Sequence, residues 1–139
     1  MAPWDLSASL MYYGRSPVVA SGYHRNLAGI LDGYRFYLAR PEEDELARRI
    51  VSRRRVRFVV AWYDRLFFRE AQRVLDLGDE FLLSSNGAIR FTAEARRSMF
   101  WRLRHGPAPR GYTLRYESPI LVQLAGGRSE PLFKIYEVD

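Results

Sequence analysis

The residues with the clearest chemical potential are Trp4 and Asp5, which are adjacent near the start of the chain. A carboxylate accepts a hydrogen bond from a hydroxyl group, and an indole offers one N–H donor and a flat apolar face. Side by side, the two could hold a serine or threonine side chain through a hydrogen bond and a methyl contact. Asp5 could instead cap a short helix, a role worth about 0.5–2 kcal/mol of stability that needs no ligand. The pair therefore predicts either a hydroxyl-binding site or a helix cap.

A block of residues around this pair resembles the W-W-D-Y-G region of oligosaccharyltransferase catalytic subunits. The matching residues are Pro3-Trp4-Asp5-Leu6-Ser7, Leu10, Tyr12, Gly14 and Arg15-Ser16-Pro17-Val18-Val19-Ala20. Farther along, Val56–Ala61 resembles the family's central strand, and its closing strand pair is matched by Leu114–Ser118 and Phe133–Val138. In that family the pentapeptide opens the soluble C-terminal domain of a large membrane enzyme.

The resemblance implies that residues 1–139 are one soluble domain of a larger membrane glycosyltransferase, tethered at the extracytoplasmic, periplasmic face. In the family, the matching tryptophan and aspartate hold the hydroxyl residue of the acceptor, so Trp4 and Asp5 are the expected substrate-binding residues. The catalytic carboxylates and the divalent metal of the family belong to the membrane portion. The resemblance thus implies no catalytic residue, metal ligand or cofactor in this chain, and no transferase activity for it alone. The implied partners are that membrane portion, an acceptor polypeptide and a lipid-linked sugar donor.

The chain also departs from the family pattern. Pro3, Leu6 and Ser7 stand where the family has tryptophan, tyrosine and glycine. After its central strand the family usually carries a D-x-x-K or M-x-x-I motif on a helix. Asp64 suits the first form, but Phe67 occupies the lysine position. These departures favour a divergent bacterial member whose acceptor differs from the usual asparagine-x-serine/threonine sequence.

Composition limits the class of protein. The chain has 139 residues, of which 47% are hydrophobic and 14% aromatic, enough for one domain with its own core. No apolar run approaches the roughly 20 residues of a membrane-spanning helix, so the chain itself is expected to be soluble. The sequence has no cysteine, which excludes disulfides and thiolate chemistry. His24 could act in acid–base chemistry, whereas His105 is interpreted as a helix-end residue, and their spacing does not indicate a metal site.

The net charge of +6 comes almost entirely from arginine, since Lys134 is the only lysine. The densest cluster contains Arg48, Arg49, Arg53, Arg54, Arg55 and Arg57. It could lie against anionic lipid or a lipid-linked pyrophosphate, with each charge contributing about 1 kcal/mol at a membrane surface. The interpretation that we favour is simpler, namely that the basic helix end complements the helix dipole.

Positive charge also leaves open a second class of function, a free-standing basic binding module for nucleic acid or anionic lipid. RNA-binding sheets usually carry exposed aromatic residues interleaved with basic ones, and no such stripe is present. The sequence therefore argues against nucleic acid as a partner.

Hydrophobic periodicity predicts alternating helices and strands. Helices are expected at about 27–38, 41–54, 65–75 and 92–104, and Thr92 is the expected cap of the last one. Strands are expected at 18–20, 56–62, 112–117, 120–124 and 132–138, with Phe81–Leu83 a strand or an ordered loop before the turn signal at Ser84–Gly87. The helix that leads into 56–62 suggests a βαβ unit. We therefore expect a single α/β domain with a mixed, mostly parallel sheet of four or five strands flanked by helices and a C-terminal antiparallel strand pair.

Overall fold

The computed structural model describes residues 1–2, 11–12, 15, 17–19, 26–64, 66–85, 88–124 and 126–139. Trp4, Asp5 and His24 lie outside the described residues. The elements, in chain order, are α2 (Leu27–Leu38), η1 (Pro41–Glu43), α3 (Asp44–Arg53), β1 (Phe58–Trp62), α4 (Phe67–Leu75), β2 (Leu82–Ser85), β3 (Ala88–Phe91), α5 (Ala93–Arg97), α6 (Met99–His105), β4 (Tyr112–Glu117), β5 (Leu121–Gln123), β6 (Ser129–Pro131) and β7 (Phe133–Val138).

The helices follow the sequence prediction closely, because their signals are local. α2 has the predicted bounds, and the helix predicted at 41–54 is a short 3₁₀ turn followed by α3. The hydroxyl of Thr92 accepts a hydrogen bond of 3.1 Å from the backbone N–H of Ala95, which confirms the predicted cap. The helix expected at 92–104 is broken at Ser98, whose hydroxyl accepts from the N–H of Trp101 and caps a second helix, α6.

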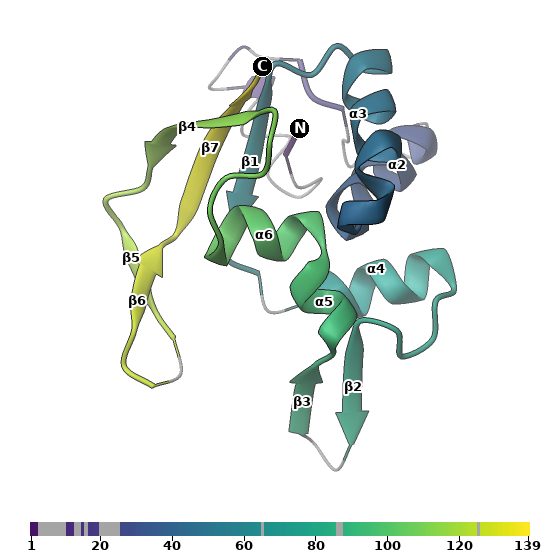
Figure 1. Ribbon diagram of the computed structural model, residues 1–139, viewed down its shortest axis with the longest axis vertical. Coiled ribbons are helices and arrows are strands. Elements are labelled where there is room, and N and C mark those ends of the chain that lie inside the picture. The colour runs from purple at the N-terminus through teal and green to yellow at the C-terminus, as the bar shows by residue number, and fades with distance from the viewer. Residues whose placement is uncertain are drawn as a thin grey trace.

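The expected mostly parallel sheet of four or five strands is wrong. The main sheet has three strands in the order β1-β7-β4, and both pairings are antiparallel. Figure 1 shows this sheet on the left and α2 and α3 on the right. The apolar run at 56–62 predicts a central parallel strand in a βαβ unit, but β1 lies at the edge of the sheet beside β7. Val18 and Val19, expected in a preceding strand, form no regular element.

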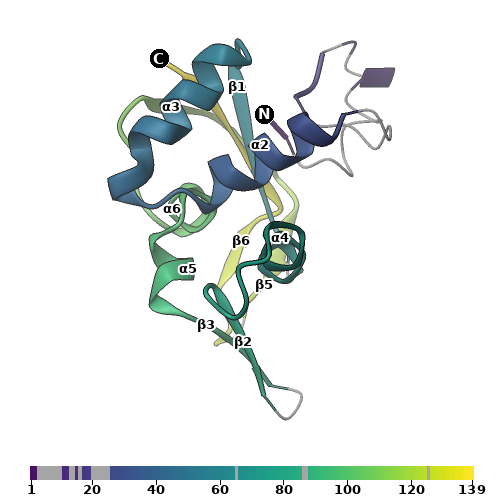
Figure 2. The ribbon, with the colours of Figure 1, turned by 90° about the vertical axis from the view of Figure 1, so that its right-hand side faces the viewer.

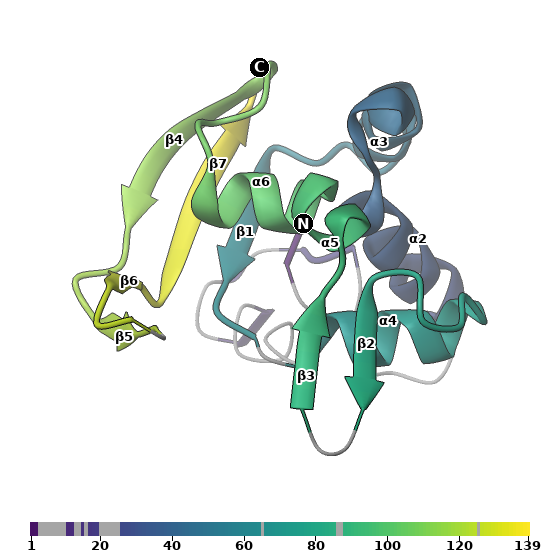
Figure 3. The ribbon, with the colours of Figure 1, turned by 60° about the horizontal axis from the view of Figure 1, so that its bottom comes forward.

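Two antiparallel hairpins extend from this body, β2 with β3 and β5 with β6 (Figures 1 and 3). An antiparallel partner for β5 was expected, but it is β6, and the strand at 133–138 pairs with β1 and β4 instead. Arg104 anchors the second hairpin, because its guanidinium group donates to the carbonyl of Pro131 at 2.7 Å and to Glu130 at 3.2 Å. That arginine side chain is only 1% exposed.

Aromatic rings from four elements form the centre of the core. The ring of Trp62 in β1 meets the rings of Tyr37 in α2, Phe67 in α4 and Phe100 in α6 at centroid distances of 5.1, 5.6 and 5.2 Å. Phe67 and Phe100 stack at 4.3 Å. Edge-to-face and stacked pairs each add about 0.5–1.5 kcal/mol beyond simple burial. The cluster therefore fixes the helices against the edge strand β1, which α2 crosses in Figure 2.

Candidate functional site

A pocket of about 710 Å³ lies beside the first half of β1. Its wall is formed by residues 1–2, residues 17–19, the connection from α3 to β1, and strands β1 and β7. We call it the N-terminal pocket, and its lining residues are Met1, Ala2, Pro17, Val18, Val19, Asn26, Arg54, Arg55, Val56, Arg57, Phe58, Val60 and Ile135.

The first wall is the start of the chain, which pairs with the edge of β1 that β7 leaves free. The amino group of Met1 donates to the carbonyl of Phe58, and the N–H of Val60 donates to the carbonyl of Met1 at 2.7 Å. This pattern is that of a parallel bridge between Met1 and Val59. The hydroxyl of Tyr37 reinforces it by donating to the carbonyl of Val60 at 2.8 Å. Burial lowers the pKa of the Met1 amino group from 8.0 to about 5, so it is neutral at pH 7.

The second wall, Pro17 to Val19, rests on the first turn of α2. The side-chain amide of Asn26 donates to the carbonyl of Val19 at 2.9 Å. A Cβ atom placed on Gly29 would clash with the same carbonyl oxygen, so only glycine permits this approach. The position of the wall thus depends on one residue of α2 that does not line the pocket itself.

The third wall is basic, but most of its charge is already paired. Arg54 donates at 2.7 Å to Asp32, a residue of α2 that is 4% exposed, and Arg53 binds the same oxygen. Arg57 donates to Glu137 in β7 at 3.3 Å. Arg53, Arg54 and Arg57 therefore have carboxylate partners in other elements, whereas the interpretation that the basic helix end complements the helix dipole stays a prediction. The N-terminal pocket is therefore an apolar hollow with an arginine rim.

In the sequence, the predicted pair lies between two segments that line this pocket. Trp4 and Asp5 lie outside the described residues, but Ala2, two positions before the tryptophan, and Pro17, within the W-W-D-Y-G-like block, both line the wall. Of the predicted arginine cluster, Arg54, Arg55 and Arg57 line this pocket.

The remaining candidates have structural roles. Asp64 accepts a hydrogen bond of 2.7 Å from the N–H of Leu66 at the start of α4. Phe67, at the position of the family's lysine, is 3% exposed and belongs to the aromatic core. The ring of His105 contacts Glu130 at 2.9 Å and lies 4.4 Å from the ring of Trp101. Its place at the end of α6 agrees with the helix-end interpretation.

Sequence analysis missed Asp32, the residue that organises the basic wall. A signal existed, because an aspartate three residues from Gly29 and two from Tyr34 falls among the buried positions of the helix predicted at 27–38. A carboxylate in such a position requires a cationic partner. Which of the many arginines supplies it could not be read from the pattern.

The fold is similar to that of the C-terminal globular domain of an oligosaccharyltransferase from Archaeoglobus fulgidus. The TM-score is 0.63, with 20% sequence identity, and the match covers 99% of this chain and 83% of that one. This chain has the fold of that domain. The sequence matches no protein-family model and no curated protein. The soluble domain expected from the resemblance is thus supported at the level of fold, whereas the bacterial assignment and the role of the motif stay predictions.

In the described part of the chain, no helix is both long enough and apolar enough to cross a membrane. Within the same residues, no three carboxylate or imidazole side chains are arranged to hold a metal ion.

Proposed function

We propose that this chain is the soluble C-terminal domain of an oligosaccharyltransferase-like membrane glycosyltransferase and that it helps to hold the acceptor polypeptide. The observation that carries the proposal is the fold shared with an oligosaccharyltransferase C-terminal domain over 99% of the chain. It is supported by the W-W-D-Y-G-like block, because Pro17, Val18 and Val19 of that block line the N-terminal pocket. In this proposal the domain is tethered at the extracytoplasmic, periplasmic face by the membrane portion of its parent.

The chemistry of the pocket suits a polypeptide ligand. Its apolar wall, which includes Val60 and Ile135, can bury side chains, and its arginine rim can meet backbone carbonyls or acidic residues. Trp4 and Asp5 would supply the specific contact, because the carboxylate accepts the proton of a serine or threonine hydroxyl and the indole covers the adjacent methyl or methylene group. No catalytic residue is assigned to this chain. The divalent metal, the catalytic carboxylates and the site for the lipid-linked sugar donor would belong to the membrane portion.

The test compares peptides that differ only in one hydroxyl group. A short threonine-containing peptide and its valine isostere are titrated into the isotope-labelled domain, and amide resonances of Val18, Val60 and Ile135 are followed by NMR. We expect the threonine peptide to shift these resonances at lower concentration. Trp4→Ala and Asp5→Asn should remove the preference, whereas Asp79→Asn, which removes an exposed carboxylate elsewhere, should not.

Gly29→Ala provides an independent variant, since it changes neither Trp4 nor Asp5. The added methyl group must displace Val19, so the response of the pocket resonances to the threonine peptide should weaken. Equal affinity for both peptides in the unmodified domain and in all variants would refute a role in acceptor binding.

A further inference from the structure

A second hollow, of about 420 Å³, lies between α3 and the start of β4. Arginines reach its wall from two distant parts of the chain, Arg48 and Arg55 from α3 and its end, and Arg110 from the loop before β4. Ser52, which lies between Arg48 and Arg55 in the sequence, also lines the hollow. We call this hollow the arginine pocket. Arg55 also lines the N-terminal pocket, so it stands at the boundary between the two.

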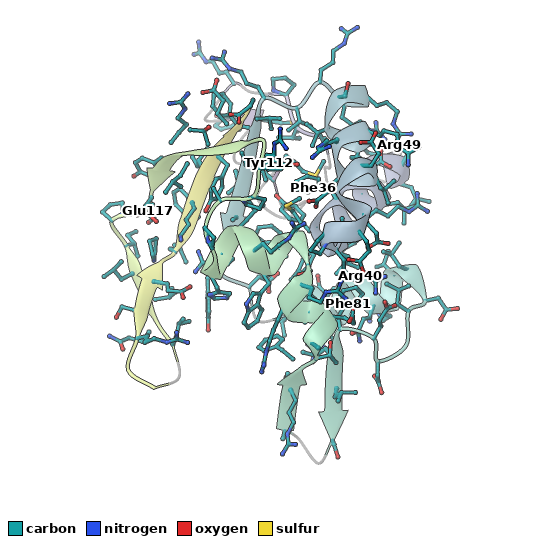
Figure 4. The ribbon with its side chains drawn as sticks, in the orientation of Figure 1. Phe36, Arg40, Arg49, Phe81, Tyr112 and Glu117 are labelled. Carbon is teal, nitrogen blue, oxygen red and sulfur yellow. The ribbon has the colours of Figure 1, made fainter. Side chains whose placement is uncertain are left out.

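Helical spacing explains how α3 separates its arginines. Arg48 and Ser52 are four residues apart on one side of α3, and Arg55 follows the helix in a left-handed turn. Arg53 and Arg54 turn toward α2, where they bind Asp32. Arg49 extends from the side of α3 that faces away from Tyr112, one of the lining residues of the arginine pocket (Figure 4).

The cations of the arginine pocket are poorly neutralised. Within the described part of the chain, Arg55 and Arg110 form no ion pair, and Arg48 has only an exposed contact of 3.7 Å with Glu45. By contrast, Arg53, Arg54 and Arg57 each contact a carboxylate at 3.3 Å or less. The acidic residue on the wall is Asp139, whose side chain accepts a hydrogen bond from Thr113. Three cations thus face one side-chain carboxylate.

The backbone of Arg55 is a second and independent sign. Its φ angle is +52°, in the left-handed region, and it follows α3 in the tight turn in which the N–H of Val56 donates to the carbonyl of Val51. Glycine is the usual residue at this position, and a residue with a side chain costs about 1–2 kcal/mol there. An arginine in a strained backbone conformation points to a function for its side chain.

We propose that the arginine pocket binds a phosphate group. Guanidinium groups bind phosphate oxygens through two parallel hydrogen bonds, and the hydroxyl of Ser52 is a further donor. A hollow of about 420 Å³ suits one phosphate or pyrophosphate better than a nucleic-acid strand, which requires a long groove and stacking surfaces. The phosphate could be free or could be the head group of a lipid. This proposal is independent of acceptor binding at the N-terminal pocket.

Calorimetric titration with inorganic phosphate and pyrophosphate at low ionic strength tests the first source. Sedimentation with phosphatidylglycerol vesicles, against phosphatidylcholine vesicles, tests the second. We expect Arg55→Gly and Arg110→Gln to weaken binding by about three- to tenfold each, as the loss of a charge-assisted hydrogen bond does. Arg128→Gln removes an exposed arginine of the β5–β6 turn and should change binding less than twofold. Asp139→Asn should strengthen binding, because it removes the opposing carboxylate.

Arg55→Gly is the decisive variant. If Arg55 only ends the helix, glycine should raise stability and leave binding unchanged, which would overturn the proposal. If the pocket binds phosphate, the same variant should be at least as stable as the unmodified chain and should still lose affinity. Binding to either the free anions or the anionic vesicles, with this dependence on Arg55 and Arg110, supports the site and identifies its source of phosphate. Binding to neither, or equal losses in Arg128→Gln, overturns it.

Discussion

The carboxylate of Asp32 accepts a hydrogen bond of 2.7 Å from the guanidinium group of Arg54. The two residues connect α2 with the end of α3, and Arg53 binds the same carboxylate oxygen. The carboxylate is 6% exposed, whereas the side chains of Arg53 and Arg54 are 65% and 29% exposed. The interaction is therefore asymmetric, because losing the arginines leaves a charge buried, while losing the carboxylate leaves charges that can reach water.

This asymmetry can be measured. The double variant Arg53→Ala/Arg54→Ala should lower the free energy of unfolding by about 3 kcal/mol, because it strands the buried carboxylate. Adding Asp32→Asn to that background should recover about 1 kcal/mol or more, since a neutral amide needs no cation. Urea unfolding at pH 7 gives all three values. Arg49→Ala, an exposed neighbour, should change stability by less than about 0.5 kcal/mol. A further loss on adding Asp32→Asn would contradict the explanation.

Local signals account for the parts of the fold that were predicted correctly. α2 was predicted from its apolar spacing and α5 from the capping hydroxyl of Thr92, both of which act within a few residues. The β2–β3 hairpin was missed although Asn86-Gly87 is a strong hairpin signal, because only a turn was inferred there and the strand at 88–91 was not.

Strand pairing could not be predicted in the same way. The apolar composition of β1 indicates burial, but it carries no information on direction, which is set by β7 more than 70 residues later. For the candidate site, Trp4 and Asp5 were found from their chemistry and from the resemblance. The walls of the pocket were not, since the contact of Met1 with β1 and that of Asn26 with Val19 join segments that no sequence pattern connects.

Acid should weaken a network centred on Arg40. This residue donates to Glu43, Glu80 and Glu94 at 3.1, 2.6 and 3.0 Å, and its guanidinium group lies over the ring of Phe81 (Figure 4). Burial alone would raise the pKa of Glu43, but the hydrogen bonds from Arg40 outweigh it and lower that pKa below 4.5. The hydrogen bond from Arg40 also lowers the pKa of Glu94.

Because both pKa values are lower in the folded state, the stabilisation is present above pH 4.5 and disappears as the pH falls through the folded-state values. Arg40→Gln should therefore be less stable than the unmodified chain at pH 7, and the difference should shrink toward pH 3. Chemical unfolding across this range provides the measurement, with Arg73→Gln as a control that lacks carboxylate partners among the described residues. A difference that does not vary with pH would count against the network.

The buried amino group of Met1 predicts that stability also depends on pH at higher pH values than those of the Arg40 network. Its pKa is about 5 in the folded state and 8.0 otherwise, so folding at pH 6 must release a proton. Acetylating Met1 removes this requirement and keeps the N–H that donates to Phe58. Acetylation should therefore raise the free energy of unfolding by about 2–3 kcal/mol at pH 6 and by almost nothing at pH 9. Thermal unfolding of the acetylated and the free form at pH 6 and pH 9 measures this difference. An equal increase in stability at both pH values would show that the charge of the amino group is not the cause.

The side chain of Gln72 should prove essential for holding the β2–β3 hairpin against α4. Its carbonyl oxygen accepts from the backbone N–H of Phe81 at 2.7 Å and from that of Leu82, and its amide donates to the carbonyl of Leu82 at 3.3 Å. Gln72→Leu keeps the size of the buried side chain but leaves those groups unpaired, which should cost about 2–4 kcal/mol. Gln123→Leu, at an exposed glutamine of β5, should cost less than about 0.5 kcal/mol.

Gln72→Glu refines the test, since a carboxylate can accept both N–H groups but must repel the carbonyl of Leu82 unless it is protonated. Its pKa should thus be raised in the folded state, so the variant should approach the stability of the unmodified chain as the pH falls and lose it as the pH rises. Urea unfolding of both Gln72 variants at pH 4 and pH 8 measures this, and a glutamate variant that gains stability with pH would show that the carbonyl of Leu82 does not oppose the carboxylate.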